Sequence, residues 1–224
     1  MKIGGFLKFS TLDYPGKISA VVFTQGCPLR CVYCHNADFQ DASSQGSVAF
    51  SEVLEFSKTR VGMLDAVVFS GGEPLLQPDL KESMRSVKGL GFQIGLHTSG
   101  AIPEKFAQIL DIVDWVGFDI KTSFDKYNKI TGVPGSGELA MESLLLLIKS
   151  GVDYELRTTF DSRNISEDDL LDIAKILRNI GATKWVLQEC ILRKKDGVDE
   201  GLLLPDSDTV SKLSEIISVD LRRE

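Results

Sequence analysis

The sequence lacks an apolar run long enough to cross a bilayer, and it has no long basic run. A membrane span needs about 20 predominantly apolar residues, and phosphate binding relies on grouped Lys and Arg. We therefore expect neither a membrane nor a nucleic acid as a partner. The first eight residues contain no uninterrupted apolar core, so they make a poor secretory signal and favour a cytoplasmic protein. The formal charge of −7 mostly indicates solubility.

Cysteine is also scarce, with four residues in 224, too few for a disulfide scaffold. Three of the four, Cys27, Cys31 and Cys34, lie within eight residues of one another, and Cys190 stands apart. Disulfides are rare in a reducing cytoplasm. Clustered cysteines in such a protein therefore indicate metal or redox chemistry.

The chain is long enough for one sizeable domain, and its hydrophobic pattern predicts a parallel α/β fold. Short runs rich in Val, Ile, Phe and Leu predict strands over 18–24, 66–70, 92–98, 115–121, 153–160 and 184–189. Helical patterns follow them over 51–61, 78–90, 103–110, 138–150, 166–180 and 206–217. Six such units are fewer than the eight of a closed barrel. We expect a partial (β/α)6 TIM-like barrel, open on one side.

We expect a single domain over 1–224. It divides into an N-terminal extension over 1–17, the partial barrel over 18–205 and a C-terminal helix over 206–224.

The clustered cysteines have the spacing C-x3-C-x2-C directly after the first predicted strand. Thiolates are the natural ligands of iron–sulfur clusters, and three of them leave one iron of a [4Fe–4S] cube open for reaction. A zinc site is the alternative, with His35 or Cys190 as the fourth ligand. Simultaneous ligation by the adjacent Cys34 and His35 is awkward, and Cys190 fits a small buried core residue.

Further polar or glycine-rich segments follow the other predicted strands. In parallel α/β folds, ligand sites collect at the carboxyl ends of the strands. Asp119 and Lys121 are two residues apart, so both point to one face of their strand, and Arg157 on the next strand could neutralise a carboxylate. The remaining segments are Ser70-Gly71-Gly72-Glu73-Pro74 and His97-Thr98-Ser99-Gly100. A plain turn or a strand-end ion pair would explain each of them individually.

The cysteine spacing, with Tyr33 just before Cys34, resembles the signature of the radical S-adenosylmethionine (SAM) superfamily. The stretch from Phe6 to Lys17, followed by Thr24-Gln25-Gly26-Cys27 and Tyr33-Cys34-His35-Asn36, resembles the glycyl-radical-enzyme activases. Within that group it is most similar to anaerobic ribonucleoside-triphosphate reductase activating proteins, and pyruvate formate-lyase activating enzymes are similar but more distant.

The resemblance implies two cofactors, a [4Fe–4S] cluster on Cys27, Cys31 and Cys34, and SAM. It also implies that Asp119 and Lys121 serve catalysis near SAM and the substrate. It places nine residues around SAM: Tyr33, Gly71, Gly72, Glu73, Pro74, Thr98, Ser99, Asp119 and Arg157. Pyruvate formate-lyase activases tend to have Asp-Thr-Asn where this chain has His97-Thr98-Ser99, so a ribose-binding carboxylate is not implied.

The activity implied is reductive cleavage of SAM to a 5′-deoxyadenosyl radical, which abstracts a glycine Cα hydrogen on a partner glycyl radical enzyme. That partner would be of the anaerobic ribonucleotide reductase type, and a flavodoxin- or ferredoxin-type protein would donate the electron. The four cysteines allow one cluster only. Two alternatives stay open at this point, a radical SAM enzyme acting on a small molecule and a non-catalytic zinc-binding module.

Overall fold

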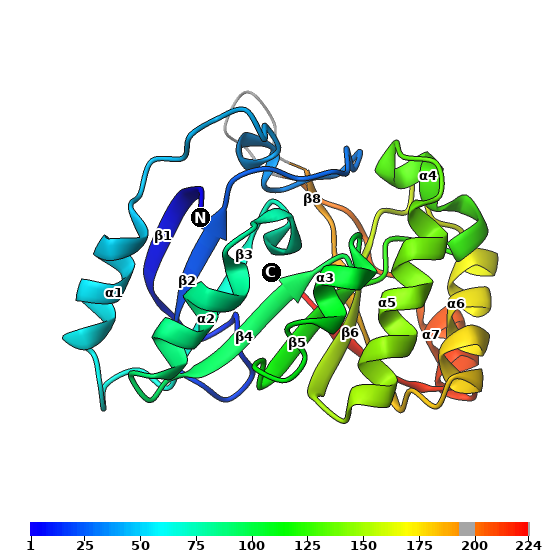
Figure 1. The fold of residues 1–224 in the computed structure, drawn as a ribbon. Helices are drawn as coiled ribbons and strands as arrows, with labels where there is room; N and C mark the ends of the chain where they lie inside the picture. The colour runs from blue at the N-terminus through cyan, green and yellow to red at the C-terminus, as the bar shows by residue number, and fades with distance from the viewer. Residues whose placement is uncertain (193–199, 224) are drawn as a thin grey trace.

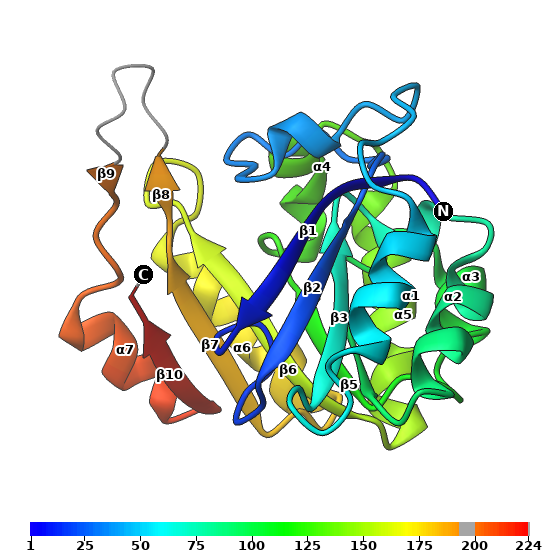
Figure 2. The same ribbon diagram turned by 90° about the vertical axis from the view of Figure 1, so that its left-hand side faces the viewer.

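The computed structural model describes residues 1–192 and 200–223, so part of the predicted barrel segment lies outside the described residues. Eight strands form one curved sheet in the order β1-β2-β3-β4-β5-β6-β7-β10 (Figures 1 and 2). Strands β2 to β7 are the six predicted ones, and each runs parallel to the next along the chain. Their bounds are Ser19–Thr24, Ala66–Gly71, Gln93–Thr98, Trp115–Asp119, Asp153–Phe160 and Lys184–Glu189. The predicted open, parallel α/β sheet is confirmed.

The two ends of the sheet differ from the prediction. Strand β1 (Ile3–Ser10) lies within the predicted extension and pairs antiparallel with β2. Helix α7 ends at Ser214, and β10 (Ser218–Arg222) then adds a strand parallel to β7. Two glycines hide the strand pattern of β1, and a Cβ at Gly4 would lie 2.5 Å from the Phe39 ring. Charged residues likewise hide the pattern of β10.

The helices pack on the convex face of the sheet and bury the main core (Figures 1 and 2). They are α1 (Phe50–Lys58), α2 (Leu80–Lys88), α3 (Pro103–Ala107), α4 (Tyr127–Thr131), α5 (Ser136–Ser150), α6 (Glu167–Asn179) and α7 (Ser207–Ser214). In α6, Leu170, Ile173 and Leu177 recur at helical spacing and are fully buried. Burial of each such side chain contributes about 1.5–3 kcal/mol.

Short elements complete the described chain, and no helix in it is long and apolar enough to cross a membrane. They are η1 (Ala37–Phe39), η2 (Pro74–Leu76), η3 (Phe124–Lys126), β8 (Ile191–Leu192) and β9 (Glu200–Gly201).

The concave face carries a second, smaller apolar cluster and, beyond it, a polar region. Tyr14 stacks on Trp115 with ring centroids 5.1 Å apart, and Val21, Ala66 and Val68 complete the cluster. Because strands β2 to β7 are parallel, their carboxyl ends meet at one edge of the sheet. The segments that the sequence analysis singled out are therefore brought to the same edge.

Candidate active site

The cysteine loop follows β2 and is anchored to neighbouring segments through its backbone. Arg30 and Val32 donate their amides to the carbonyls of Thr131 and Ile130, at 2.7 and 3.1 Å. At the end of the loop, Asn36 Nδ2 donates to the carbonyl of Gly71 at 3.2 Å. The loop is therefore fixed on one side by α4 and on the other by the end of β3.

Gly72 allows the Gly-Gly segment to lie directly against the start of the cysteine loop. A Cβ at Gly72 would be 2.2 Å from the carbonyl oxygen of Gly26. Gly71 has a φ of 107°, and a Cβ there would be 2.3 Å from the amide of Thr24. Both positions require glycine, because neither backbone neighbour has room for a side chain.

The three clustered thiols are partly buried. Burial, together with the charge of Glu73, raises the pKa of Cys27 to about 12. Burial also raises the pKa of Cys31, although the Lys121 ammonium acts in the opposite direction. Because a metal ligates the thiolate form, cluster binding has to displace protons from these side chains.

Two tyrosines connect the cysteine loop to the end of β5. Tyr33 OH donates to the carbonyl of Lys121 at 3.1 Å, and Lys121 donates its amide to Tyr127 OH at 3.0 Å. Both rings are almost fully buried, and burial holds the pKa of each hydroxyl well above its usual range. They therefore act as neutral hydrogen-bonding groups that fix the backbone on either side of Lys121.

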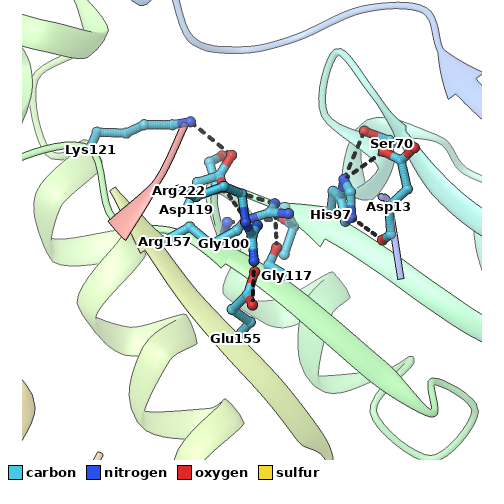
Figure 3. A network of polar contacts seen from close by, with 12 residues as sticks. Asp13, Ser70, His97, Gly100, Gly117, Asp119, Lys121, Glu155, Arg157 and Arg222 are labelled. Carbon is cyan, nitrogen blue, oxygen red and sulfur yellow. Dashed lines mark hydrogen bonds and ion pairs between the residues drawn. The ribbon is translucent and has the colours of Figure 1, made fainter. Parts of the chain in front are cut away.

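Asp119 is the centre of an ion-pair network (Figure 3). Lys121 Nζ lies 3.0 Å from Asp119 Oδ2, and Arg157 Nη2 lies 2.9 Å from Asp119 Oδ1. Arg157 also donates to the carbonyl of Gly117, at 3.2 Å. Burial works against the charged carboxylate, but the two cations outweigh it and hold the pKa of Asp119 well below its usual range. The network therefore carries a net charge of +1, with Arg157 neutralising Asp119.

Glu73 is directed toward the end of β4. Its carboxylate is 1% exposed and accepts four hydrogen bonds. The donors are Thr98 Oγ1 at 2.7 Å, Ser99 N at 2.9 Å, Ser99 Oγ at 2.6 Å and Leu75 N at 3.2 Å. Pro74 follows as the first residue of η2 and is buried. Glu73 thus holds the Thr98–Ser99 turn in place. Each of its two carboxylate oxygens already accepts two hydrogen bonds from the chain.

His97 lies on the concave face between Ser70 and the backbone of Asp13 (Figure 3). Its Nε2 is 2.8 Å from the carbonyl of Asp13, and its Nδ1 is 3.4 Å from Ser70 Oγ. Burial, reinforced by the Arg157 charge, lowers the pKa of His97 to about 3. A carbonyl can only accept, so neutral His97 carries its proton on Nε2.

The structure brings the predicted residues together from five separate segments. Cys190 is not part of this group. It is fully buried and packs behind Tyr33 and Ile130, as expected for a small core residue. Asn36, Tyr127 and Arg222 contribute to the site or its border but were not predicted. Asn36 directly follows the cysteine motif, whereas the sequence carries no signal for the other two.

The donor set fits an iron–sulfur cluster better than a zinc ion. Zinc gathers its sulfur ligands at about 2.3 Å around one atom, whereas each thiolate on a [4Fe–4S] cube binds a different iron. Within residues 1–192 and 200–223, no three His, Cys, Asp or Glu side chains are grouped closely enough to hold one metal ion. The three thiols nevertheless share one anchored loop.

Comparison with known proteins supports the same assignment. The family model described as the Radical SAM superfamily matches residues 21–177. A Methanocaldococcus jannaschii protein that carries the name of a glycyl-radical enzyme activating enzyme is 34% identical, over 96% of this chain and 90% of its own length. The pyruvate formate-lyase-activating enzyme of Clostridium pasteurianum is 33% identical, over 75% of this chain and 73% of its own.

Among solved structures, QueE from Escherichia coli has the same fold, with a TM-score of 0.61 and 15% identity over 99% of this chain and 93% of its own. Enzymes of the matched superfamily use a [4Fe–4S] cluster and SAM, the two cofactors that the cysteine motif implied. The family model covers most of the described sheet, from β2 into α6. The chain therefore belongs to the radical SAM superfamily.

Proposed function

We propose that this enzyme activates a glycyl radical enzyme by removing a hydrogen atom from the Cα of a glycine in that partner. The single observation that carries the proposal is the convergence of the cysteine loop and the Asp119–Lys121–Arg157 network at one edge of the sheet. The names of the relatives from Methanocaldococcus jannaschii and Clostridium pasteurianum support the same activity.

In this proposal Cys27, Cys31 and Cys34 hold the cluster. The cluster and SAM supply the radical chemistry, since one electron cleaves SAM and the 5′-deoxyadenosyl radical takes the hydrogen. The protein's own part is to bind and orient the cofactors and the substrate.

The groups around the loop suit the parts of SAM. Lys121 and Arg157 offer positive charge to the SAM carboxylate, and Asp119 holds both cations in position. Gly71 and Gly72 allow close approach of the SAM ammonium group to backbone carbonyls. The turn fixed by Glu73 presents Thr98 and Ser99 to the remainder of SAM. Pro74 begins η2 beside that turn, and Tyr33 supports the cysteine loop from behind.

The partner that we propose is an anaerobic ribonucleotide reductase-type enzyme, and the electron donor a flavodoxin- or ferredoxin-type protein. The similarity of the Phe6–Lys17 stretch to activating proteins of that group supports this choice. The open sheet supports it as well, because a polypeptide loop requires access from the side (Figure 2).

Anaerobic reconstitution followed by incubation with SAM, a reductant and candidate partners tests the proposal. We expect a glycyl radical signal by electron paramagnetic resonance, accompanied by stoichiometric 5′-deoxyadenosine. A radical SAM enzyme that acts on a small molecule would cleave SAM without modifying any partner. SAM cleavage that never generates a radical on an intact glycyl radical enzyme would overturn the activase assignment.

A further inference from the structure

A second ion pair borders the Asp119–Arg157 network and involves the last strand of the sheet. Glu155 lies on β6 two residues before Arg157, so both side chains project from the same face. Arg222 on β10 donates Nη2 to Glu155 Oε2 at 2.8 Å (Figure 3). In the strand registers, Glu155 is opposite Gly117, and Arg222 is opposite Gln188 of β7. The pair therefore joins β6 to β10 across the concave face.

This pair keeps unused hydrogen-bonding capacity. The Glu155 side chain is only 10% exposed, and its second oxygen, Oε1, is buried without a hydrogen-bond partner among the described residues. Arg222 is 37% exposed. In the part of the chain that the structure describes, the bond to Glu155 is the one hydrogen bond that the Arg222 side chain makes. An unpaired buried acceptor is unfavourable, so Oε1 is suited to receive a donor from outside the chain.

The same side of the sheet faces the proposed active site. In the strand registers, His97 on β4 and Glu155 on β6 are both opposite Gly117 of β5, so the two side chains project from the same face of the sheet. A Cβ at Gly117 would lie 2.7 Å from the Arg157 guanidinium, so a side chain there would crowd Arg157. His97 is neutral, and Lys121, Asp119 and Arg157 are already paired with one another. Since the proposed function assigns Lys121 and Arg157 to SAM, Glu155 Oε1 and the free edge of Arg222 are the groups on this face, among the described residues, that are left to recognise a second ligand.

The chemistry of the pair selects one class of ligand. Glu155 and Arg222 neutralise each other, so a free carboxylate or phosphate would meet an unpaired carboxylate oxygen beside the guanidinium. A peptide group carries one N–H donor and one C=O acceptor, and it is uncharged. We propose that Glu155 and Arg222 bind a backbone peptide group of the polypeptide substrate, whose N–H donates to Glu155 Oε1 and whose C=O accepts from Arg222. This inference rests on the proposed function, which supplies a polypeptide as the substrate.

The test uses the cluster-loaded enzyme with SAM and a fluorescent, glycine-centred heptapeptide amide copied from the partner. A series of peptides is methylated at one backbone nitrogen at a time, and binding is measured by anisotropy. We expect one methylation to weaken binding to the wild type roughly tenfold or more, since hydrogen bonds to charged groups are strong. In Glu155→Leu, the same methylation should change binding less than about twofold, because the acceptor is gone.

Arg222→Met provides a second variant if Glu155→Leu fails to fold. It should weaken binding of the unmethylated peptide, while the methylation effect persists through Glu155. Asp220→Asn is the matched control. Asp220 lies on the same strand as Arg222, and the variant breaks its exposed pair with Lys184 of β7 while leaving Glu155 untouched. That control should bind every peptide as the wild type does.

A methylation effect as large in Glu155→Leu as in the wild type, binding of the unmethylated peptide as tight in Arg222→Met as in the wild type, or the absence of peptide binding to the wild type would overturn the inference. The proposed function would survive that result if the wild type still generates a glycyl radical on the intact partner. Failure of radical formation on every partner, by contrast, would count against the proposed function itself.

Discussion

Arg157 Nη2 lies 2.9 Å from Asp119 Oδ1, an ion pair that joins two neighbouring parallel strands at the edge where the cysteine loop is anchored. Lys121 shares the same carboxylate through its other oxygen. One acidic side chain thus sets the position of two cations. Removing its charge should affect both of them at once.

Asp119→Asn should lower the free energy of unfolding by about 2 kcal/mol, because it leaves two partly buried cations without their counter-ion. SAM binding should weaken as well, since both cations lose their orientation. Urea unfolding and isothermal titration of the loaded enzyme with SAM measure the two effects. Asp220→Asn, in an exposed pair, should cost less than about 0.5 kcal/mol. Equal losses in the two variants would contradict the central role of Asp119.

Cys31→Ala should abolish cluster binding and SAM cleavage while the fold survives, because the main core lies on the opposite face of the sheet. Iron content, 5′-deoxyadenosine production and thermal unfolding measure this. Cys190→Ala is the matched control, since Cys190 packs behind Tyr33 outside the loop. It should retain the cluster and lose about 1 kcal/mol of stability as a small core truncation. Retained deoxyadenosine production by Cys31→Ala would exclude it as a cluster ligand.

The parallel sheet and the cysteine loop could be predicted because local sequence determines both. Strands buried on two faces read as continuous apolar runs, and three thiols within eight residues carry their own chemical signature. The two-residue spacing of Asp119 and Lys121 likewise predicted that both side chains project from one face of the strand. The spacing alone did not predict that Arg157 binds the same carboxylate.

Other parts depend on contacts that sequence spacing does not reveal. Glu73 reads as a free charge next to two glycines, but its carboxylate is used by Thr98 and Ser99, 25 and 26 residues away. Strand β10 was missed because it is short and includes charged side chains, so its sequence carries no clear apolar strand pattern. Arg222 was missed with it, because its partner Glu155 is 67 residues earlier in the chain.

Glu73→Gln should lower the free energy of unfolding by about 1–3 kcal/mol, because the amide nitrogen cannot accept a hydrogen bond and faces two donors in either orientation, Ser99 N and Oγ or Thr98 Oγ1 and Leu75 N. The turn carrying Thr98 and Ser99 would then shift, and the KM for SAM should rise. Denaturant unfolding and the KM of SAM cleavage measure these effects. Thr98→Val removes only one of the four hydrogen bonds and should produce the smaller change. A Glu73→Gln enzyme with wild-type stability and KM would show that the turn is held by other contacts.

The neutral state of His97 makes a defined contribution to acid sensitivity. Its pKa falls from 6.5 to about 3 on folding, so the unfolded chain binds the proton more readily. The stability that His97 provides is therefore fully present above about pH 6.5, and it is lost as the pH falls toward 3. At pH 5 the loss should be about 2 kcal/mol, from 1.36 kcal/mol for each pH unit below 6.5. In His97→Gln this loss should disappear, because Gln does not titrate.

Urea unfolding of the wild type and His97→Gln at several pH values from 5 to 8 measures the difference. Acidic groups such as Asp119 and Asp169, whose pKa values are also lowered on folding, titrate in both proteins and cancel in the comparison. The two stability curves should therefore be parallel above about pH 7 and converge as the pH falls, whatever the variant costs at neutral pH. Curves that remain parallel down to pH 5 would mean that folding does not lower the pKa of His97, and the assignment of His97 as a group that burial keeps neutral would then be wrong.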